Sequence, residues 1–542
     1  MSASFALAGL VACTKQPLER IVPYVKQPEE LVPGKPLSYA TAIEIGGFAQ
    51  GLLATSYDGR PTKLEGNPDH PASLGATSIF GQAAILDLYD PDRSQAILHA
   101  GAISTWEAFA GALHDALAAP ELKQGAGLRI LTESITSPTL AAQLQAVLAK
   151  FPRAKWHQYQ PIARDSIREG ALLAFGEDVE PHYHFDKADV IVALDSDFLF
   201  NAPGALRYAR EFADRRRVST GRAEMSRVYV VEPTPTVTGS NADHRLPVPA
   251  SAVRAIAEAI AIELKLLSAR LDQTYDSAFV SAAAADLREH RGAGLVIAGI
   301  EQPPAVHVLA HAMNSALGNI GNTVTFTAPV ETNRVNQTQS LRELIGDMES
   351  GAVDLLVILG GNPAFTAPAD LDFAAHLSKV KTRVHLGLYV DETAEQCHWH
   401  IPAAHFLEAW SDTRAFDGTV SITQPLIEPL YRGKSAHELV DAFLNLPARG
   451  SSYDIVREHW RSQKPWTDFE KGWRKAVHDG VIAGTALPAR QVTLRADALE
   501  SLGARPPAMA NLEISFRADP CVWDGRFANN GWLQELPKPI TK

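Results

Sequence analysis

The stretch DLLVILGG, residues 354–361, decides the fold class, because it is an apolar run of strand length that ends in two glycines. A strand that is buried on both faces has such a continuous apolar sequence, and strands of this kind belong to parallel sheets covered by helices. Helical patterns such as SPTLAAQLQAVLAKF (137–151) separate five similar runs. These runs are LRILTE (128–133), DVIVALD (189–195), RVYVVEP (227–233), GLVIAG (294–299) and RVHLGLYV (383–390). The sequence therefore predicts an α/β protein, and its six strands suit two Rossmann-like units better than one.

The overall composition excludes some classes of function. The chain has 542 residues, of which 46% are hydrophobic and 21% charged, and its formal net charge is −12. These proportions are typical of a globular protein with several domains. The acidic balance disfavours a nucleic-acid partner, because phosphate contacts need clustered lysine and arginine.

The three cysteines, Cys13, Cys397 and Cys521, lie far apart, and the sequence contains no CxxC pair. An iron–sulfur cluster needs about four thiolates, so we expect no cysteine-ligated cluster built by this chain alone. The same spacing argues against a disulfide framework.

The N-terminal residues suggest export and lipid attachment. The apolar run FALAGLVA (5–12) is far shorter than the roughly 20 residues that span a bilayer, and it is typical of the end of a signal peptide. LVAC (10–13) resembles a bacterial lipobox, which predicts lipidation of Cys13 and attachment to a membrane. The alternative is a buried N-terminal helix with an incidental cysteine. Prolines at positions 17, 23, 28 and 33 then predict an extended arm over residues 14–38.

Short fragments in a fixed order run through the rest of the chain. They are DGR (58–60), EGNP (65–68), HP (70–71), ADVIV (188–192) with Asn201 and Pro203, VEP (231–233) with Thr238, AD (242–243), LP (246–247), NSALGNIG (314–321), GGNP (360–363), ETA (392–394), IPA (401–403) and Glu408. As an ordered set they resemble the molybdopterin-dependent oxidoreductases of the dimethyl sulfoxide reductase superfamily. The resemblance covers roughly residues 40–542. It implies a small β-rich N-terminal domain plus two interleaved Rossmann-like parallel-sheet domains.

The domain division that we expect follows this resemblance. It comprises a signal-peptide remnant (1–13), the arm (14–38), a vestigial cluster domain without its cluster (39–100), a discontinuous Rossmann-like domain (101–164 and 330–445), an inserted Rossmann-like domain (165–329), and a helical, aromatic segment with a linker to a further C-terminal part (446–542). Asp58-Gly59 predicts a hairpin turn in the small domain, which a helix near 81–89 closes. We expect Trp523, Phe527 and Trp532 to anchor the linker.

One departure from the family pattern bears on function. The family's cluster motif would lie at about residues 40–52, and its last cysteine would stand at Ser78, yet none of these positions is cysteine. The resemblance therefore implies that the loop keeps its role in the fold and has lost its metal.

A narrower resemblance concerns three segments. Residues 13–36, 385–410 and 527–542 are similar to the large iron–sulfur subunits of alternative complex III, a bacterial quinol:cytochrome c (or electron-acceptor) oxidoreductase. The similarity implies a scaffold on the periplasmic face of the inner membrane, lipid-anchored through Cys13, with no cofactor of its own. Iron–sulfur clusters are then expected in a ferredoxin-like iron–sulfur domain outside this chain, and haem c in a multihaem cytochrome c subunit. A quinol-oxidising integral membrane subunit is the further partner.

Gly360, Gly361, Asn362 and Pro363 form the candidate binding loop, because glycines at the carboxyl end of a strand let a ligand approach the backbone. In cofactor-bearing relatives this loop helps to hold a pterin dinucleotide, and here we expect a retained turn beside an empty crevice.

Other polar groups invite a metal or acid–base interpretation. Cys397, His398, His400 and His405 form one set, His182 and His184 a second, and Glu408, Asp412 and Asp417 a third. We expect a structural strand and loop for the first set, because strand alternation splits it. For the second set the alternative to a metal site is a surface turn. For the third we expect a solvated or loop-capping role, because nothing brings a substrate or a nucleophile to it. Whether the chain itself has an active site stays open. The alternatives are an active molybdopterin oxidoreductase that lacks only the N-terminal cluster, and a periplasmic binding protein.

Overall fold

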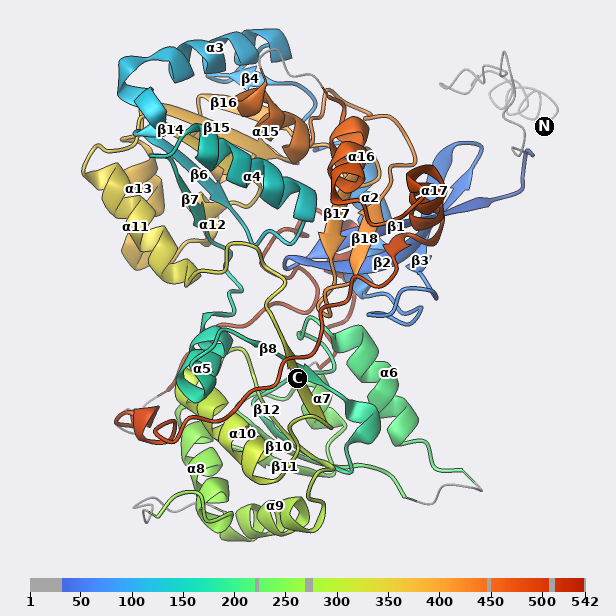
Figure 1. Cartoon of the computed structure of the whole chain (residues 1–542), viewed down its shortest axis with the longest axis vertical. Coiled ribbons are helices and arrows are strands. Elements are labelled where there is room, and N and C mark those ends of the chain that lie inside the picture. The colour runs from blue at the N-terminus through green and yellow to red at the C-terminus, as the bar shows by residue number, and fades with distance from the viewer. Residues whose placement is uncertain (1–31, 220–223, 269–275, 446–449, 506–511, 541–542) are drawn as a thin grey trace, which may run out of the picture.

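Two parallel sheets, one above the other in Figure 1, form the centre of the molecule. The computed structural model describes residues 32–219, 224–268, 276–445, 450–505 and 512–540. Cys13 and the predicted arm up to residue 31 lie outside these ranges. Within them, no helix is both long and apolar enough to cross a lipid bilayer.

The larger sheet has seven strands in the order β5-β4-β16-β15-β14-β6-β7, and the five from β16 to β7 are parallel. Its strands come from two separate parts of the chain, so the prediction of interleaved Rossmann-like domains is confirmed. They are β4 (Leu98–His99), β5 (Ala102–Ile103), β6 (Leu128–Thr132), β7 (Lys155–Gln158), β14 (Leu355–Leu359), β15 (Thr382–Gly387) and β16 (Trp399–Pro402).

Helices cover both faces of this sheet. Leu355, Val357 and Leu359 of β14 face one hydrophobic cluster, and Leu356 and Ile358 face the opposite one. This alternation explains why the run DLLVILGG is apolar throughout. The covering helices are α3 (Trp106–Ala118), α4 (Pro138–Lys150), α11 (Gln337–Glu349), α13 (Phe373–Leu377) and α15 (Ala436–Leu444), with the short α12 (Pro363–Thr366) and α14 (Glu392–Glu395) at the edge.

The smaller parallel sheet has the order β11-β10-β9-β12. Its strands are β9 (Val190–Leu194), β10 (Arg227–Glu232), β11 (His244–Pro247) and β12 (Gly294–Ala298), and β8 (Glu180–Tyr183) pairs with β13 (Val324–Thr327) beside it. The helices around it are α5 (Asp165–Phe175), α6 (Ala205–Arg215), α7 (Val237–Ser240), α8 (Val253–Glu263), α9 (Ser277–Glu289) and α10 (Pro304–Ala316).

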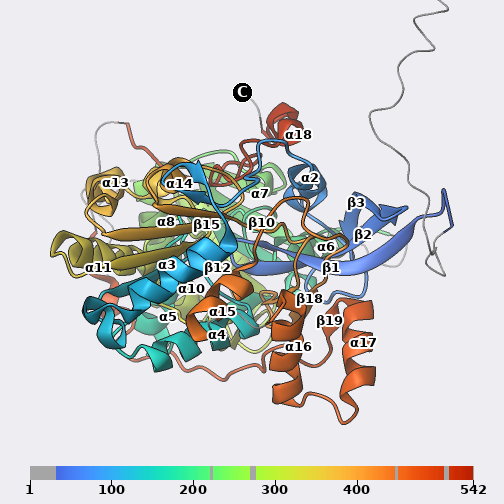
Figure 2. The same cartoon turned by 90° about the horizontal axis from the view of Figure 1, so that it is seen from above.

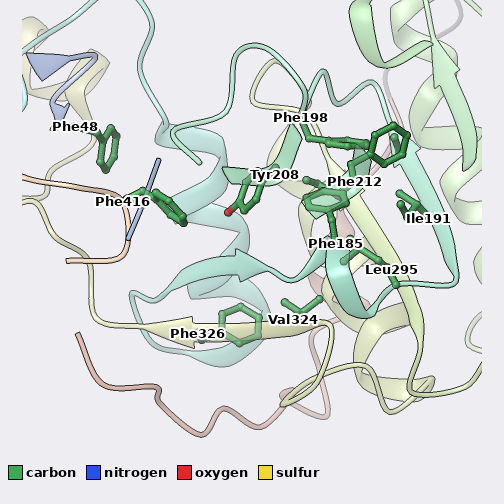
Figure 3. Packing of buried hydrophobic residues seen from close by; sticks show 14 of the residues in the cluster. Phe48, Phe185, Ile191, Phe198, Tyr208, Phe212, Leu295, Val324, Phe326 and Phe416 are labelled. Carbon is green, nitrogen blue, oxygen red and sulfur yellow. The ribbon is translucent and has the colours of Figure 1, made fainter. Parts of the chain in front are cut away.

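An aromatic cluster joins this unit to the N-terminal sheet. Phe185 stacks on Phe198 with ring centroids 4.2 Å apart. Figure 3 shows Phe48 and Phe416 approaching Tyr208 of the same cluster from other elements. Burial of these large rings holds the units against one another.

The small N-terminal sheet consists of β1 (Leu37–Ile45), β2 (Phe48–Tyr57) and β3 (Arg60–Gly66), all antiparallel. Asp58 and Gly59 form the predicted turn, with φ values of 51° and 83°. The helix α2 (Ile79–Leu88) follows. A distant part of the chain completes this region, with β17 (Ser411–Arg414), β18 (Val420–Thr423), β19 (Val481–Ile482), α16 (Ser452–Gln463) and α17 (Phe469–Asp479). These elements project to one side of the parallel sheets (Figure 2).

The described part of the C-terminal segment, which includes α18 (Gly531–Glu535), contacts all three units through Phe527, Arg517 and Arg526. Phe527 stacks on Phe80 with a centroid distance of 4.8 Å, and Trp523 meets the same ring edge-on at 5.5 Å. These two aromatic side chains anchor the segment as predicted. Trp532 is 45% exposed and is not buried in this way.

Candidate functional site

A cavity of about 850 Å³ lies at the carboxyl ends of β6 and β14. These neighbouring strands mark the point where the strand order of the larger sheet reverses, since β6 leads to β7 on one side and β14 leads to β15 on the other. In α/β sheets, such reversal points are where ligands bind. The loop Gly360-Gly361-Asn362-Pro363, which the sequence singled out, lines this cavity.

The loop is held by its own polar contacts. Gly360 and Gly361 have φ values of 73° and 70°, a conformation that favours glycine. The Asn362 side chain accepts hydrogen bonds from the Thr393 hydroxyl (2.7 Å) and backbone N–H (3.2 Å), and it donates to Glu392 (2.6 Å). Asn362 therefore fixes the loop to α14, and its side-chain groups are occupied within the protein.

Glu133 follows β6 directly, and at the cavity its carboxylate forms an ion pair with Arg526 of the same chain. Nη2 of Arg526 lies 2.5 Å from Glu133 Oε1 and 2.6 Å from Asp524 Oδ2, while Nε donates to Asp524 Oδ1 at 2.9 Å. Burial opposes the charge of Arg526, but Glu133 and Asp524 hold its pKa well above the ordinary value. The guanidinium is thus shared between two carboxylates of the same chain.

Two further carboxyl groups face the same cavity. The side chain of Glu44 is accessible from the cavity but is enclosed by the surrounding protein, so desolvation, helped by Glu133, raises its pKa to about 7. Desolvation likewise raises the pKa of Asp391 to about 6. Six carboxyl groups line the cavity, against two cations: Glu44, Asp92, Glu133, Asp391, Glu392 and Asp524, with Lys434 and Arg526.

The strand order of the smaller sheet also reverses, between β9 and β12, and we call the region at the carboxyl ends of these two strands the smaller crevice. Asp195 follows β9 with φ of 55°, and the backbone approaches so closely that a Cβ on Gly299 would lie 1.8 Å from the Asp195 carbonyl oxygen. Nη2 of Arg517 lies 2.8 and 2.7 Å from the two carboxylate oxygens of Asp195, whose side chain is 0% exposed. Burial still raises the pKa of Asp195, against the effect of Arg517 and Gln302.

The two crevices therefore share one arrangement. In each, a carboxylate directly after a central strand is paired with an arginine from residues 517–526 of the C-terminal segment. A single segment thus supplies a guanidinium to both switch points.

Ser78, at the position of the expected cluster ligand, has a structural role. Its hydroxyl donates to Gln50 Oε1 (2.7 Å) and accepts from Gly81 N–H (3.1 Å), which makes Ser78 the N-cap of α2. The adjoining cavity of about 260 Å³ is largely apolar, with Phe48, Phe80 and Trp523 in its wall. Nowhere in the part of the chain that the structure describes do three His, Cys, Asp or Glu side chains gather to hold a metal ion.

The histidines near β16 form a chain of hydrogen bonds. His400 Nδ1 lies 3.2 Å from Nδ1 of His385 on β15, and His400 Nε2 lies 2.8 Å from the Ser94 hydroxyl. His385 Nε2 reaches the carbonyl oxygen of Gly361 at 3.2 Å. Because desolvation lowers the pKa of His385 to about 4 and that of His400 to about 3, both rings are neutral and serve as structural partners.

The remaining members of this set also lie apart. His398 Nδ1 accepts the backbone N–H of Arg383 at 3.2 Å, and Cys397 is buried in a hydrophobic cluster. His405 lies beside Glu408, which accepts its backbone N–H at 2.9 Å. Cys397, His398 and His400 line one cavity of about 600 Å³ and His405 does not, and among the described residues these side chains form no group that could hold a metal ion.

His182 and His184 are bound to threonines rather than to metal. They lie at and just beyond β8, and their Nε2 atoms are 2.8 Å from Thr327 Oγ1 and 2.9 Å from Thr325 Oγ1 on the paired strand β13. The sequence left open a surface turn here, but β8 is a largely buried strand.

Of the three acidic candidates, only Asp417 caps a loop near the surface, by accepting the Thr419 N–H at 2.9 Å. Glu408 is 4% exposed and accepts from Arg93 at 2.6 and 3.1 Å. Asp412 is fully buried and accepts from the Ser137 and Thr139 hydroxyls and from the indole N–H of Trp460. Their role is structural, but these two are buried rather than solvated.

Comparison with known proteins adds the family context. No family model matches the sequence. The menaquinone reductase, molybdopterin-binding-like subunit of Nitratidesulfovibrio vulgaris is 25% identical over 517 residues, which cover 85% of this chain and 72% of that protein. Acetylene hydratase from Pelobacter acetylenicus superposes with a TM-score of 0.56 and 12% identity, over 79% of this chain and 70% of the hydratase. The chain has a molybdopterin-oxidoreductase-like fold.

This fold implies a pterin dinucleotide as cofactor, and the charged residues at the two crevices decide whether such a molecule fits. A pterin dinucleotide carries an anionic diphosphate, which requires free cations or unpaired backbone donors. The charged side chains that line the larger cavity are chiefly carboxylates; its arginine is bound to two of them, and Lys434 is bound to Glu438. In the smaller crevice, Arg517 is bound to Asp195. The residues present do not fit the dinucleotide.

Sequence reasoning missed the residues that give these crevices their chemistry. Glu133 and Asp195 end two of the apolar runs that predicted strands, so a signal was present in LRILTE and DVIVALD. Their partners, Arg526 and Arg517, lie more than 300 positions away, and no local pattern indicates the pairing.

Proposed function

We propose that this chain is a non-catalytic, molybdopterin-oxidoreductase-like scaffold in a quinone-linked respiratory oxidoreductase. One observation carries the proposal: at both switch points the carboxylate that follows the strand is paired with an arginine of the chain itself, Glu133 with Arg526 and Asp195 with Arg517. A guanidinium that is already bound to an internal carboxylate is not free to bind the anionic diphosphate of a pterin dinucleotide. The helix-capping role of Ser78 supports the same conclusion for the cluster position.

The comparison supports the quinone-linked setting. The relative from Nitratidesulfovibrio vulgaris is named as a subunit of a menaquinone reductase and as molybdopterin-binding-like. A subunit of this kind works beside partner chains at a membrane that contains quinone. The scaffold would fix the spacing between redox centres held by those partners, since electron tunnelling depends steeply on distance.

The narrower assignment is alternative complex III. In this assignment, a quinol-oxidising integral membrane subunit, a ferredoxin-like iron–sulfur domain and a multihaem cytochrome c subunit carry the electrons. The chain would lie on the periplasmic face of a bacterial inner membrane, anchored through a lipid on Cys13. Detergent purification followed by mass spectrometry of the N-terminus and of the co-purifying chains tests this assignment.

Glu44→Gln separates a scaffold from an active molybdopterin oxidoreductase or a binding protein. Glu44 is the cavity carboxyl whose pKa, about 7, suits proton transfer. For a scaffold, we expect quinol-dependent electron transfer in membranes to stay within about twofold of the wild type, whereas removal of the whole chain abolishes it. General acid–base catalysis contributes about 10²–10⁴-fold, so an active site that uses Glu44 would lose at least tenfold.

Glu349→Gln, at an exposed position on α11, is the matched control. The proposal is contradicted if Glu44→Gln assembles normally, retains partner chains in wild-type proportion and still loses tenfold or more in rate, while Glu349→Gln does not.

A further inference from the structure

Residues 512–516 present their apolar side chains to solvent. Leu512 is 96% exposed, Ile514 82% and Phe516 88%. These three positions alternate along LEISF, so their side chains share one face of the segment. Most large apolar side chains of a folded chain are buried, and a contiguous exposed patch marks an interaction site.

The polar side chains between them attach the segment to the protein. Glu513 accepts hydrogen bonds from the Ser251 backbone N–H (3.0 Å) and from the Ser251 hydroxyl. Arg517 binds Asp195 in the smaller crevice. The segment is therefore held to the protein through Glu513 and Arg517, while its apolar side chains point outward.

The backbone of this segment is also free to pair. Residues 512–518 run without helix, turn or bend, and they make no backbone–backbone hydrogen bond with any other described residue. A row of unpaired N–H and C=O groups beside alternating apolar side chains is the template that an added β-strand recognises.

The charge of the chain indicates whether this segment binds a second copy of the chain or a different protein. The chain has a net charge of −12, so two copies repel each other over long range. The smaller crevice beside the segment is itself acidic, because Asp195, Glu232 and Glu301 lie around Arg517 and Asp197 lies near Glu232, while Arg245, paired with Glu232, is another cation. A neutral or basic partner is favoured over self-association.

We propose that residues 512–518 are the docking edge for an extended strand of a partner subunit. The partner strand pairs its main chain with this edge and covers Leu512, Ile514 and Phe516 with alternating apolar side chains, and basic residues flank it. The inference uses the proposed function only for the expectation that partner subunits exist. The presence of molybdenum in the chain would overturn the scaffold role and leave this docking edge intact.

Hydrogen–deuterium exchange of the full chain, alone and in the detergent-purified complex, is the first test. We expect the amides of 513–518 to exchange at least tenfold more slowly in the complex, because pairing would remove them from solvent. Equal exchange in the two states would overturn the proposal.

A photo-crosslinking amino acid at position 514 identifies the occupant, with position 103 as the control, since Ile103 is 77% exposed on the far edge strand β5. We expect a crosslink from 514 to an extended, alternately apolar peptide of a stoichiometric partner subunit. A crosslink only to a second copy of this chain, or none, contradicts the proposal.

Ile514→Lys with Phe516→Lys tests the energetic contribution of the face, and Ile103→Lys is the matched variant. Since these side chains are exposed, the isolated chain should unfold within about 2 °C of the wild type. The double variant should lower the recovery of intact complex at least tenfold, and the control should not. If intact complex is recovered equally with the double variant and with Ile103→Lys, the apolar face of residues 512–516 does not bind a partner.

Discussion

Replacing Arg517 by alanine is expected to lower the free energy of unfolding by about 3–5 kcal/mol, the cost of leaving one member of a buried ion pair uncompensated. The Asp195 side chain is 0% exposed and that of Arg517 is 18% exposed, so water cannot replace the guanidinium without opening the crevice. Of the polar contacts that bind Asp195 to other side chains, only the one from Gln302, at 2.8 Å, would be left. Chemical denaturation followed by fluorescence measures the change.

Two variants make this prediction specific. Arg495→Ala removes an exposed pair with Asp497 and should change stability by less than about 0.5 kcal/mol. The double variant Asp195→Asn with Arg517→Ala should lower the free energy of unfolding by clearly less than the sum of the two single variants. Each single variant leaves the other member of the pair buried without its partner, and the double variant does not. If Arg517→Ala is as stable as Arg495→Ala, Arg517 does not close the crevice.

Stability is expected to fall by several kcal/mol between pH 7.5 and pH 5.5, because seven histidines that are buried in the neutral form together cost about 10 kcal/mol and carboxyl groups with raised pKa values offset part of this loss. Desolvation is the main cause of their lowered pKa values, and each pH unit below 6.5 costs about 1.4 kcal/mol per histidine. The group comprises His70, His182, His307 and His385, with pKa values of about 4, and His311, His400 and His405, with pKa values of about 3.

The direction follows from proton uptake. Below pH 6.5 the unfolded chain binds protons on these histidines, and the folded chain does not until the pH approaches 4 or 3, so their contribution is complete above pH 6.5 and is lost as the pH falls. Glu44, with a pKa of about 7, and Asp87 and Asp391, each about 6, act in the opposite sense because the folded chain binds their protons first. The histidines outnumber these carboxyl groups, so acid destabilises the fold.

His311→Phe should flatten the pH dependence. His311 lies among Phe175 and Phe326, at centroid distances of 5.0 and 5.6 Å, so a phenyl ring suits its site. His114→Gln, at an exposed histidine, should leave the slope unchanged. Unfolding temperatures measured by scanning fluorimetry from pH 5 to 8 compare the variants. A wild-type midpoint that rises as the pH falls, or equal slopes for both variants, would contradict the prediction.

The strands that the sequence predicts are those whose residues are apolar throughout, because this pattern indicates burial on both faces of the sheet. DLLVILGG and the five other apolar runs became β14, β6, β9, β10, β12 and β15 because helices cover both of their faces. The strand β8, EPHY, was not predicted, since its residues are polar and include proline. Glu180 in β8 is buried through pairs with Arg164 and Arg334, which are tertiary contacts that no local period reveals.

The sequence predicts where the candidate site lies, but it does not predict which charged groups pair there. The Gly360-Gly361-Asn362-Pro363 loop lines the cavity, since glycines after an apolar strand indicate a backbone that must turn there. The capping role of Ser78 was open to prediction from a serine before an apolar helix. The pairing of Arg517 and Arg526 was not, because the fold alone brings residues so far apart in sequence together.

The metal and pterin content of the purified chain tests most directly whether the chain is a scaffold without a bound molybdopterin cofactor. The chain should be isolated with its partners in mild detergent, and molybdenum and tungsten should be measured by plasma mass spectrometry alongside oxidised pterin fluorescence. We predict less than about 0.1 molybdenum or tungsten atom per chain and no pterin, because Arg526 and Arg517 hold Glu133 and Asp195. About one molybdenum or tungsten atom per chain with matching pterin would contradict this, and would make the chain an enzyme.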